Sequence, residues 1–285
     1  MGSMRGNGLN TTIAIIGAGM MGAGIGGRLH ENGCRVLTLL EGRSEASHER
    51  AATAGMENVA LGDLAQAELI LSIVPPAQAD AVVETLAPLF AGGSAPLFCD
   101  ANALSPDSKR EMAQRVEQLG GQMVDGAIIG AAPRAGHDGP RLYACGKDAH
   151  RLAKLSDFGV ETRILEGPLG AAASLKMCYG GINKGIIGLT TAMLLAAQRH
   201  GAAEDVCREL AIGLKPLLDR SRSNIPAMYP RAYRWDAEMH EIAAFLAHDD
   251  PAAASIWHGI GEFFTDRAQA HEAGRELGEL VELLG

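Results

Sequence analysis

Aromatic and basic residues are both scarce in this sequence of 285 residues. It contains 2 Trp, 4 Tyr and 6 Phe, and its 25 Lys plus Arg face 34 Asp plus Glu, a net charge of −9. Proteins that bind nucleic acid neutralise phosphates with basic side chains, and single-strand binders also stack bases on aromatic rings. The composition therefore argues against a nucleic-acid partner. It leaves open a small anionic ligand held by backbone N–H groups.

Cysteines and long apolar runs are also few. The five cysteines are widely spaced and form no Cys-x-x-Cys pair, which favours reduced thiols over a disulfide framework or a zinc site. The nine histidines show no metal-ligand spacing, so we expect no metal. The longest uncharged run, 185–198, is shorter than the ~20 residues of a spanning helix, and residues 1–10 lack the apolar core of a signal peptide. We expect a cytoplasmic protein with no membrane partner.

Short β-branched and leucine-rich runs alternate with alanine-rich helical segments in the first half of the chain. The expected strands are 12–16, 35–40, 68–74, 95–100 and 122–125. The expected helices include 20–32, 79–86 and 106–119, the last with Ser105 as its N-cap. Nearly continuous apolar strands separated by helices are typical of a parallel sheet covered on both faces. The first half is thus predicted to be a doubly wound α/β domain.

The second half loses the strand signal after about residue 170. Residues 174–199 carry an apolar series at helical spacing, made of Leu175, Tyr179, Ile182, Ile186, Leu189 and Met193. Glycines in the same segment allow another helix to approach closely: Gly180, Gly181, Gly185 and Gly188. Further helical segments continue to residue 282. The sequence therefore predicts an α/β domain over 1–166 and an all-helical domain over 167–285.

A glycine-rich loop joins the first expected strand to the first expected helix. It has the pattern Gly-x-Gly-x-x-Gly and consists of Gly17, Ala18, Gly19, Met20, Met21 and Gly22. In this context the first glycine permits a tight turn, the second lets the backbone approach a pyrophosphate, and the third packs helix against strand. The helix N-terminus offers N–H donors to the anion. These residues are predicted to bind a dinucleotide in a Rossmann-type domain.

The residues at the end of the second expected strand indicate which dinucleotide is bound. Glu41 stands where an acidic side chain would bind the ribose hydroxyls and repel a 2′-phosphate, which favours NAD. Arg43 and Ser44 follow directly and offer a guanidinium and a hydroxyl to a 2′-phosphate, which favours NADP. We expect NADP, with NAD as the alternative.

Together these motifs resemble the β-hydroxyacid dehydrogenase family, which includes 6-phosphogluconate dehydrogenase and hydroxyisobutyrate dehydrogenase. The resemblance extends from Thr12 to about Leu246 and is strongest to the branch with a "phosphogluconate dehydrogenase, NAD-binding, putative C-terminal" domain. The motifs that carry it are Gly17–Gly22, Leu40-Glu-Gly-Arg-Ser44, Val74-Pro75-Pro76, Asp100-Ala-Asn102-Ala-Leu-Ser105-Pro106, Val124-Asp-Gly-Ala-Ile-Ile-Gly130, the helix with Lys176, and Arg231-Ala-Tyr-Arg-Trp-Asp-Ala-Glu238-Met-His-Glu241. The resemblance implies that Val74 and Pro75 line the ribose and nicotinamide side of the cofactor. It places Asn102 at the nicotinamide half; the alternative is that this residue only caps the helix that starts near Ser105.

The family's catalytic group is a lysine in Gly-x-Gly-x-x-x-Lys-x-x-x-Asn, and here it matches Lys176. An amine in an apolar, small-residue segment also suits proton transfer on chemical grounds. The asparagine of the motif is replaced by Gly180, and we expect Asn183 or Tyr179 to take its place.

A second departure concerns the substrate. Family members commonly carry Asp-Ala-Pro-Val-Ser-Gly-Gly, whose serine contacts the substrate carboxylate; here Ile129 stands at that serine, followed by Gly130. A hydroxyl donor is thereby replaced by an apolar wall, which favours a larger or less polar substrate.

These residues predict an NAD(P)-dependent oxidoreductase that interconverts a secondary alcohol, β-hydroxyacid-like or a related hydroxy compound, and its ketone. Lys176 would be the general acid/base. The resemblance also implies a homodimer formed through the helical domain. The alternatives are an imine reductase of the same architecture, which usually lacks the lysine, and a dinucleotide-binding sensor without turnover.

Overall fold

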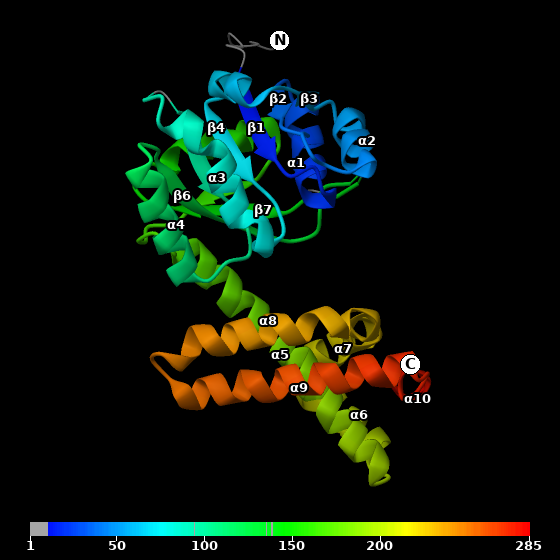
Figure 1. Cartoon of the computed structure of the whole chain (residues 1–285). Helices are drawn as coiled ribbons and strands as arrows, with labels where there is room; N and C mark the ends of the chain where they lie inside the picture. Colours follow the sequence, from blue (N-terminus) through cyan, green and yellow to red (C-terminus); the bar gives the residue numbers. More distant parts are fainter. Residues whose placement is uncertain (1–10, 94, 135, 138) are drawn as a thin grey trace, which may run out of the picture. The chain divides into compact units, whose positions relative to one another are not determined.

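The computed structural model describes residues 11–285 except 94, 135 and 138 (Figure 1). Residues 1–10, where the sequence lacks a signal-peptide core, lie outside the described residues. The chain divides into two compact units, Met1–Lys176 and Met177–Gly285, referred to below as the sheet unit and the helical unit. The division lies beyond the boundary at 166/167 that the sequence suggested, because the first turn of the following helix, α5 (Ala171–Arg199), packs on the sheet through Ala172.

The sheet unit contains an eight-stranded sheet in the order β3-β2-β1-β4-β5-β6-β7-β8. Its strands are β1 (Thr12–Ile16), β2 (Arg35–Thr38), β3 (Glu57–Asn58), β4 (Leu69–Ser72), β5 (Leu97–Asp100), β6 (Met123–Ile129), β7 (Arg141–Cys145) and β8 (Thr162–Ile164). All neighbours pair in parallel except β6 and β7, which are antiparallel. The predicted doubly wound α/β fold is confirmed, and three strands are added to it. Of these, β3 and β8 are too short to show a periodic pattern in the sequence.

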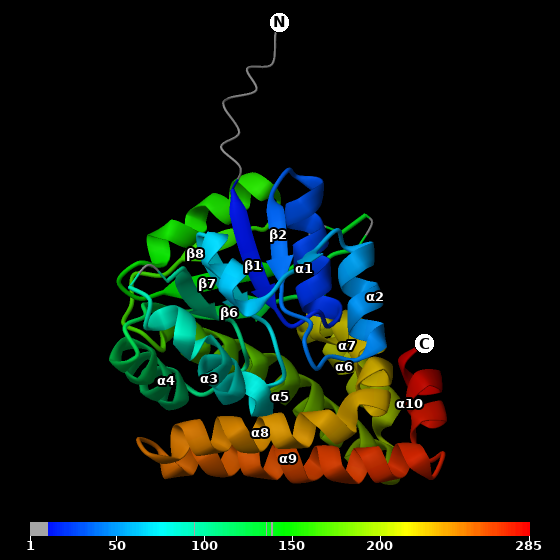
Figure 2. The same cartoon turned by 45° about the horizontal axis from the view of Figure 1, so that its top comes forward.

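Helices cover both faces of this sheet (Figure 2). The helical segments of the sheet unit are α1 (Met20–Glu31), α2 (Glu45–Thr53), η1 (Leu61–Gln66), η2 (Pro76–Gln78), α3 (Ala79–Phe90), α4 (Pro106–Gln118) and η3 (Ala149–Phe158). Ser105 is the N-cap of α4, as predicted, since its Oγ accepts from the Ser108 N–H at 3.1 Å. Pro106 follows at the first helical position, where its missing N–H leaves no bond unmade.

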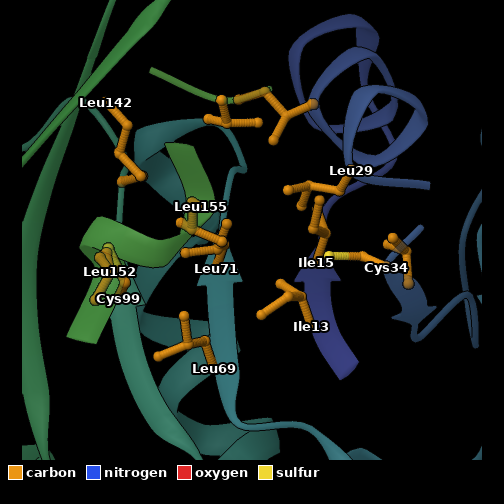
Figure 3. Close-up of a cluster of buried hydrophobic side chains, with 14 of the residues drawn as sticks. Ile13, Ile15, Leu29, Cys34, Leu69, Leu71, Cys99, Leu142, Leu152 and Leu155 are labelled. Atoms are coloured by element: carbon orange, nitrogen blue, oxygen red, sulfur yellow. The ribbon is translucent and has the colours of Figure 1, made fainter. Parts of the chain in front are cut away.

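Two apolar cores lie on the two faces of the sheet because successive strand residues point in opposite directions. Ile13 and Ile15 of β1 pack with Leu29 of α1 on one face (Figure 3), whereas Ala14 and Ile16 pack on the other face. The first core also contains Leu152 and Leu155 of η3; the second contains residues of α3 and α4. This two-sided burial explains why the strands read as unbroken apolar runs.

The helical unit consists of most of α5 and the helices that follow it. These are α6 (Ala203–Gly213), α7 (Lys215–Met228), η4 (Tyr229–Arg231), α8 (Ala232–Ala247), α9 (Pro251–Glu272) and α10 (Leu277–Leu284). Residues 177–285 contain no strand, so the predicted all-helical region is confirmed. In Figure 1, α8 and α9 lie side by side and cross α5. Their core includes Tyr229, Met239 and Phe264, each at most 1% exposed.

The glycines of α5 lie on the side of this helix that packs inside the helical unit. A Cβ added at Gly185 would stand 2.4 Å from Trp257 Cζ3, and one at Gly188 would stand 3.2 Å from Phe264 Cζ. The close approach expected from the glycines is therefore confirmed. By length and composition α5 could also cross a membrane, but a core helix passes the same test, and this glycine side is covered by α9.

The apolar series predicted on α5 is largely exposed. Five of its members are at least 36% exposed: Tyr179, Ile182, Ile186, Leu189 and Met193. The 3–4 spacing correctly indicated an amphipathic helix, but the helical core is contacted by glycines together with Ile187, Leu194 and Leu195 rather than by this series. An apolar side of this extent is unusual on a surface that meets only water.

Candidate dinucleotide and active site

The glycine loop has the geometry that its spacing predicts. Gly17 has φ +108°, and a Cβ on it would stand 2.3 Å from the Ile73 carbonyl oxygen, so only glycine fits. A Cβ at Gly22 would stand 1.9 Å from the Gly17 oxygen, because helix α1 packs tightly against the loop. At Gly19, by contrast, nothing lies within 4 Å of an added Cβ. The second glycine thus borders open space, as the approach of a pyrophosphate requires.

The start of α1 is suited to an anion. Its N-cap is Gly19, and within the described part of the chain no side chain caps it. The first-turn N–H groups, including those of Met20 and Met21, are therefore available to a negatively charged ligand, which the helix dipole also favours. Met20 is 81% exposed, whereas Ala18 is buried.

The loop after β4 is packed against the glycine loop. A Cβ at Gly17 would also touch Val74 Cγ1, at 2.8 Å, and the Ile73 N–H donates to the Ile16 oxygen at 2.8 Å. Val74 is buried and Pro75 is exposed. Because β1 and β4 are parallel neighbours, both loops leave the sheet at its carboxyl edge, where ligands of such sheets bind.

The side chain of Asn102 holds the loop after β4 by hydrogen bonds. Its Oδ1 accepts from the Val74 N–H at 2.6 Å, and its Nδ2 donates to Ser72 Oγ at 2.9 Å and to Asp100 Oδ2 at 2.5 Å. The side chain is 3% exposed. The capping alternative is wrong, because the cap of α4 is Ser105 itself. The carboxamide fixes the position of Val74.

The end of β2 borders a cavity of about 290 Å³. The lining residues are Ile16, Leu39, Glu41, Gly42, Arg43, Gln78, Ala81, Val82, Thr85 and Leu86. Arg43 Nη1 donates to Gln78 Oε1 at 2.7 Å, which holds the guanidinium at the rim. The cavity combines apolar walls with Glu41 and Arg43, a lining that suits an adenosine group.

Ser44 belongs to a polar group at the start of α2. Ser44 Oγ lies 3.1 Å from Ser47 Oγ, and Arg50 Nη2 donates to Ser47 Oγ at 3.1 Å. Arg50 Nε also donates to the Ala18 oxygen in the glycine loop at 2.9 Å. The sequence reasoning did not single out Ser47 or Arg50. Their i, i+3 spacing on a helix that starts at Ser44 is the signal that was available.

The carboxyl end of β6 carries Ile129, the residue predicted to form an apolar wall of the substrate site. Ile129 is the last residue of β6 and is 9% exposed, paired in register with Arg141 of β7. Gly130 follows with φ +124°, and its added Cβ would stand 3.0 Å from Pro140 Cα. The chain turns sharply after Ile129, at the same edge of the sheet as the glycine loop.

The helix that carries Lys176 begins on the sheet. Asp125 Oδ2 accepts from the Ala173 N–H at 3.0 Å, and Cys145 Sγ accepts from the Ala172 N–H at 3.3 Å. The Cys145 thiol also donates to Asp125 Oδ2 at 3.4 Å. Burial, and next the charge of Asp125, raise the pKa of Cys145, which keeps the thiol protonated as this bond requires. Lys176 is half-buried, one turn further along α5.

The two residues proposed to replace the family asparagine differ in their surroundings. Tyr179 is 49% exposed. Asn183 accepts a hydrogen bond at Oδ1 from Arg220 of α7. The position of the asparagine itself is Gly180, where an added Cβ would stand 3.2 Å from Glu238 Oε1.

The residues of the sheet unit fit a dinucleotide. Gly19 borders open space, the start of α1 is uncapped by side chains, and the cavity beside Glu41 has the size of a small ligand site. For a metal ion, the described residues bring together no group of three or more His, Cys, Asp or Glu side chains. The geometry thus defines a dinucleotide-binding α/β protein.

Comparison with protein families gives the same class. Residues 12–157 match the model of the NAD binding domain of 6-phosphogluconate dehydrogenase, and residues 197–266 match a domain of unknown function (DUF1932). The chain belongs to the 6-phosphogluconate dehydrogenase-like family of NAD(P)-binding oxidoreductases, as predicted. A nicotinamide dinucleotide is the cofactor class of this family.

Individual relatives are distant. An uncharacterised 28.5 kDa protein of Methanothermus fervidus is 25% identical over 214 residues, which are 74% of this chain and 81% of that protein. The conserved protein MTH1747, of unknown function and similar in structure to 3-hydroxyacid dehydrogenases, is 28% identical with a TM-score of 0.78, covering 93% of this chain and 100% of that one. The 3-hydroxyisobutyrate dehydrogenase of Mycobacterium tuberculosis is 18% identical with a TM-score of 0.72, covering 97% and 99%. An imine reductase of Myxococcus stipitatus has 16% identity and a TM-score of 0.61, covering 97% and 100%. The last two show the fold alone.

Proposed function

We propose that this protein is an NAD(P)-dependent dehydrogenase that interconverts a secondary alcohol and its ketone. The observation that carries the proposal is the set of features gathered at the carboxyl edge of the sheet. The glycine loop with its open Gly19 position follows β1, and the loop with Val74, which Asn102 holds, follows the neighbouring strand β4. The helix that carries Lys176 is attached to the sheet where Asp125 of β6 accepts the Ala173 N–H. This combination supports a dinucleotide site and a catalytic role for the Lys176 amine.

In the proposed reaction each residue has a defined task. The first turn of α1 and the Gly17–Gly22 loop hold the pyrophosphate, and Val74 and Pro75 line the nicotinamide side. The nicotinamide dinucleotide, when bound, supplies or accepts the hydride. Lys176 Nζ takes the hydroxyl proton as the alcohol is oxidised and returns it in the reverse direction. Asn102 acts indirectly, by holding Val74 through its N–H.

For the cofactor we propose NADP rather than NAD. Arg43 and Arg50 bring two guanidinium groups to the start of α2, where Ser44 and Ser47 add hydroxyls. Such a group suits a 2′-phosphate, whereas the carboxylate of Glu41 opposes it. Thermal-shift measurements with NAD⁺, NADH, NADP⁺ and NADPH test this choice. We expect a larger Tm increase with the NADP pair, and a larger increase with the NAD pair would reverse the assignment.

For the substrate we propose a hydroxy compound that is larger or less polar than the usual β-hydroxyacids. Ile129 closes the carboxyl end of β6 with a buried apolar side chain where the family has a serine hydroxyl. Gly130, Tyr179 and Asn183 are the further residues we assign to substrate contact. An Ile129→Ser variant should gain activity towards small β-hydroxyacids relative to larger secondary alcohols.

The role of Lys176 is tested with Lys176→Met. Loss of a general acid/base lowers kcat by about 10²–10⁴-fold, while NADPH affinity should stay within about threefold of wild type. Lys215→Met is the matched control, because Lys215 pairs with Asp219 on the surface of α7. Full turnover in the Lys176→Met variant would refute the assigned mechanism.

An imine reductase is the second candidate function. Its support is the fold shared with the Myxococcus stipitatus enzyme and the loss of the serine and asparagine of the hydroxyacid motifs. Reduction of a cyclic imine without oxidation of any alcohol would select it. A non-catalytic dinucleotide sensor would bind NADPH and turn over neither substrate class.

We also propose that the protein acts in the cytoplasm as a homodimer formed through the helical unit. The exposed apolar side of α5 supports the dimer, since a second copy would remove its side chains from water. A small molecule, and neither nucleic acid nor membrane, is the proposed further partner.

A further inference from the structure

One lysine is fully buried in the sheet unit, although no step proposed above uses it. Lys109 of α4 is 0% exposed. Burying an ammonium group is costly unless it is paired and hydrogen-bonded. Lys109 Nζ donates to the backbone carbonyl oxygens of Asp100, at 2.6 Å, and Gly126, at 3.2 Å. It also donates to the side-chain carboxylate of Asp100 and lies 3.3 Å from Asp125 Oδ1. The amine is therefore completely engaged.

The two carboxylates belong to neighbouring strands. Asp100 ends β5, Asp125 lies in β6, and the two residues are register partners in the sheet. Both are 0% exposed. Without Lys109 between them, two negative charges would face each other in a dry interior, where their repulsion is only weakly screened. The lysine thus holds the two strand segments and their side chains in one arrangement.

From Asp100 the network leads to the cofactor loop. Asp100 Oδ2 accepts from Asn102 Nδ2, and Asp100 Oδ1 accepts from the Asn102 N–H at 3.2 Å. Asn102 in turn accepts the Val74 N–H. The orientation of the carboxamide therefore depends on a carboxylate that Lys109 fixes. This is the cofactor arm of the network.

From Asp125 the network leads to α5. Gly170, which precedes the helix, has no side chain with which to cap it, and an added Cβ would stand 2.9 Å from Arg110 Nη1. Asp125, which lies in β6, caps the helix instead by accepting the Ala173 N–H. Lys176 follows three residues later. This is the helix arm of the network.

We propose that Lys109 is a positioning residue on which two segments depend separately: the cofactor loop through Asp100, and the helix of the proposed acid/base through Asp125. This shared dependence on one lysine is the coupling of the two arms. The roles of the two arms in cofactor binding and proton transfer rest on the proposed function, whereas their hydrogen bonds are seen in the structure. Lys109 touches neither substrate nor cofactor in this proposal. Its task is to keep both arms in a single geometry.

Hydrogen–deuterium exchange tests the coupling without any turnover. Lys109→Met should speed exchange about tenfold in two separate segments, 72–76 and 171–177, while segment 45–53 of α2 stays unchanged. Ser72→Ala removes an Asn102 partner and should speed only 72–76. Asp125→Asn weakens the cap and should speed only 171–177. Lys154→Met, which breaks a surface ion pair with Glu68, is the control and should change none of them.

Kinetics give the second readout. Ser72→Ala should weaken NADPH binding about threefold or more with kcat kept, Asp125→Asn should lower kcat with NADPH affinity kept, and Lys109→Met should do both. A uniform rise of exchange over the whole sheet unit in Lys109→Met, or no rise, would overturn the inference. Should Lys109→Met not fold, the two single-arm variants decide: an effect of either one on both segments, or on neither, overturns it.

The two proposals fail in different ways. The exchange pattern without any cofactor binding or turnover would refute the proposed function and leave the network standing. Turnover that depends on Lys176, together with unchanged exchange in Lys109→Met, would refute the coupling alone.

Discussion

The sheet unit and the helical unit use small residues and buried groups for different ends. In the sheet unit Gly17, Gly19 and Gly22 shape the loop of the proposed dinucleotide site, and the charged side chains of Lys109 and Asp125 are buried and paired. In the helical unit the glycines of α5 serve packing, and five larger apolar side chains of the same helix are exposed, namely Tyr179, Ile182, Ile186, Leu189 and Met193. The sheet unit thus buries paired charges beside its glycine loop, whereas the helical unit leaves part of an apolar helix side exposed.

The largest effects should come from the glycine loop, where two neighbouring substitutions separate folding from binding. Gly22→Ala should cost about 3 kcal/mol of unfolding free energy, because its Cβ would stand 1.9 Å from a backbone oxygen that cannot move away. Gly19→Ala should change stability by less than about 0.5 kcal/mol, since the site is open and φ is −73°.

The same pair is then compared in binding. Gly19→Ala should raise the Kd for NADPH about tenfold or more, because the methyl group would stand where the pyrophosphate approaches. Denaturant unfolding and isothermal titration measure the two quantities. Unchanged NADPH affinity in a folded Gly19→Ala protein would place the cofactor elsewhere.

In the helical unit a glycine substitution should act on packing alone. Gly185→Ala gains up to about 1 kcal/mol in helix propensity but forces the Trp257 ring to shift, at a cost of about 2–3 kcal/mol. We expect a net loss of about 1–2 kcal/mol with NADPH affinity unchanged. Gly259→Ala in α9, where nothing lies within 4 Å of the added Cβ, is the control and should be stabilising. Equal effects of the two variants on Tm would contradict the packing assigned to α5.

Substitutions on the exposed side of α5 should weaken dimer formation without changing the stability of the fold. Leu189 is 61% exposed, so Leu189→Arg should leave the fold intact and weaken the proposed dimer at least about tenfold. Light scattering would then show a mass near 29.8 kDa for the variant, against twice that value for wild type at the same concentration. Gln118→Arg on α4 controls for the added charge. A wild-type protein that is monomeric at micromolar concentrations would refute the dimer.

A further effect concerns alkaline pH. Burial, and next the charge of Glu68, raise the pKa of Cys34 to about 11, whereas exposed Cys178 has no such burial. The folded state therefore keeps Cys34 protonated while the unfolded chain ionises it, so stability falls as pH rises from about 9 towards 11, by at most about 1.4 kcal/mol per pH unit for this thiol. Cys34→Ala should flatten this decline and Cys178→Ala should not, as measured by urea unfolding across this pH range. Equal slopes in wild type and Cys34→Ala would contradict the burial of the thiol.

The sequence was sufficient for those features that local patterns encode. The β1–loop–α1 segment and the Ser105 cap follow from residue type and spacing, and the structure agrees with both. The network around Lys109 could not be predicted in the same way, because it depends on the register of β5 and β6 and on the tertiary capping of α5. One signal was available: Lys109 shares a helix face with Met112 and Val116, both buried.

The helical unit was harder to read because residue size misled the interpretation of α5. A stripe of large apolar side chains normally marks the face of a helix that meets the core. Here Trp257 and Phe264 from α9 lie against glycines of α5. The buried large side chains of α5 are Ile187, Leu194 and Leu195, which do not belong to the predicted series. Pattern alone does not distinguish a face that meets the protein's own core from one that meets a partner.

The reaction type can be decided in a single assay. The purified full chain is incubated with NADP⁺ or NADPH and a panel of small β-hydroxyacids, larger secondary alcohols, their ketones and cyclic imines, and the reduced-nicotinamide absorbance is followed for wild type and Lys176→Met. We expect turnover of at least one secondary alcohol or ketone, and we expect Lys176→Met to lose it. Turnover of cyclic imines alone, or turnover of alcohols that persists without Lys176, would contradict this expectation.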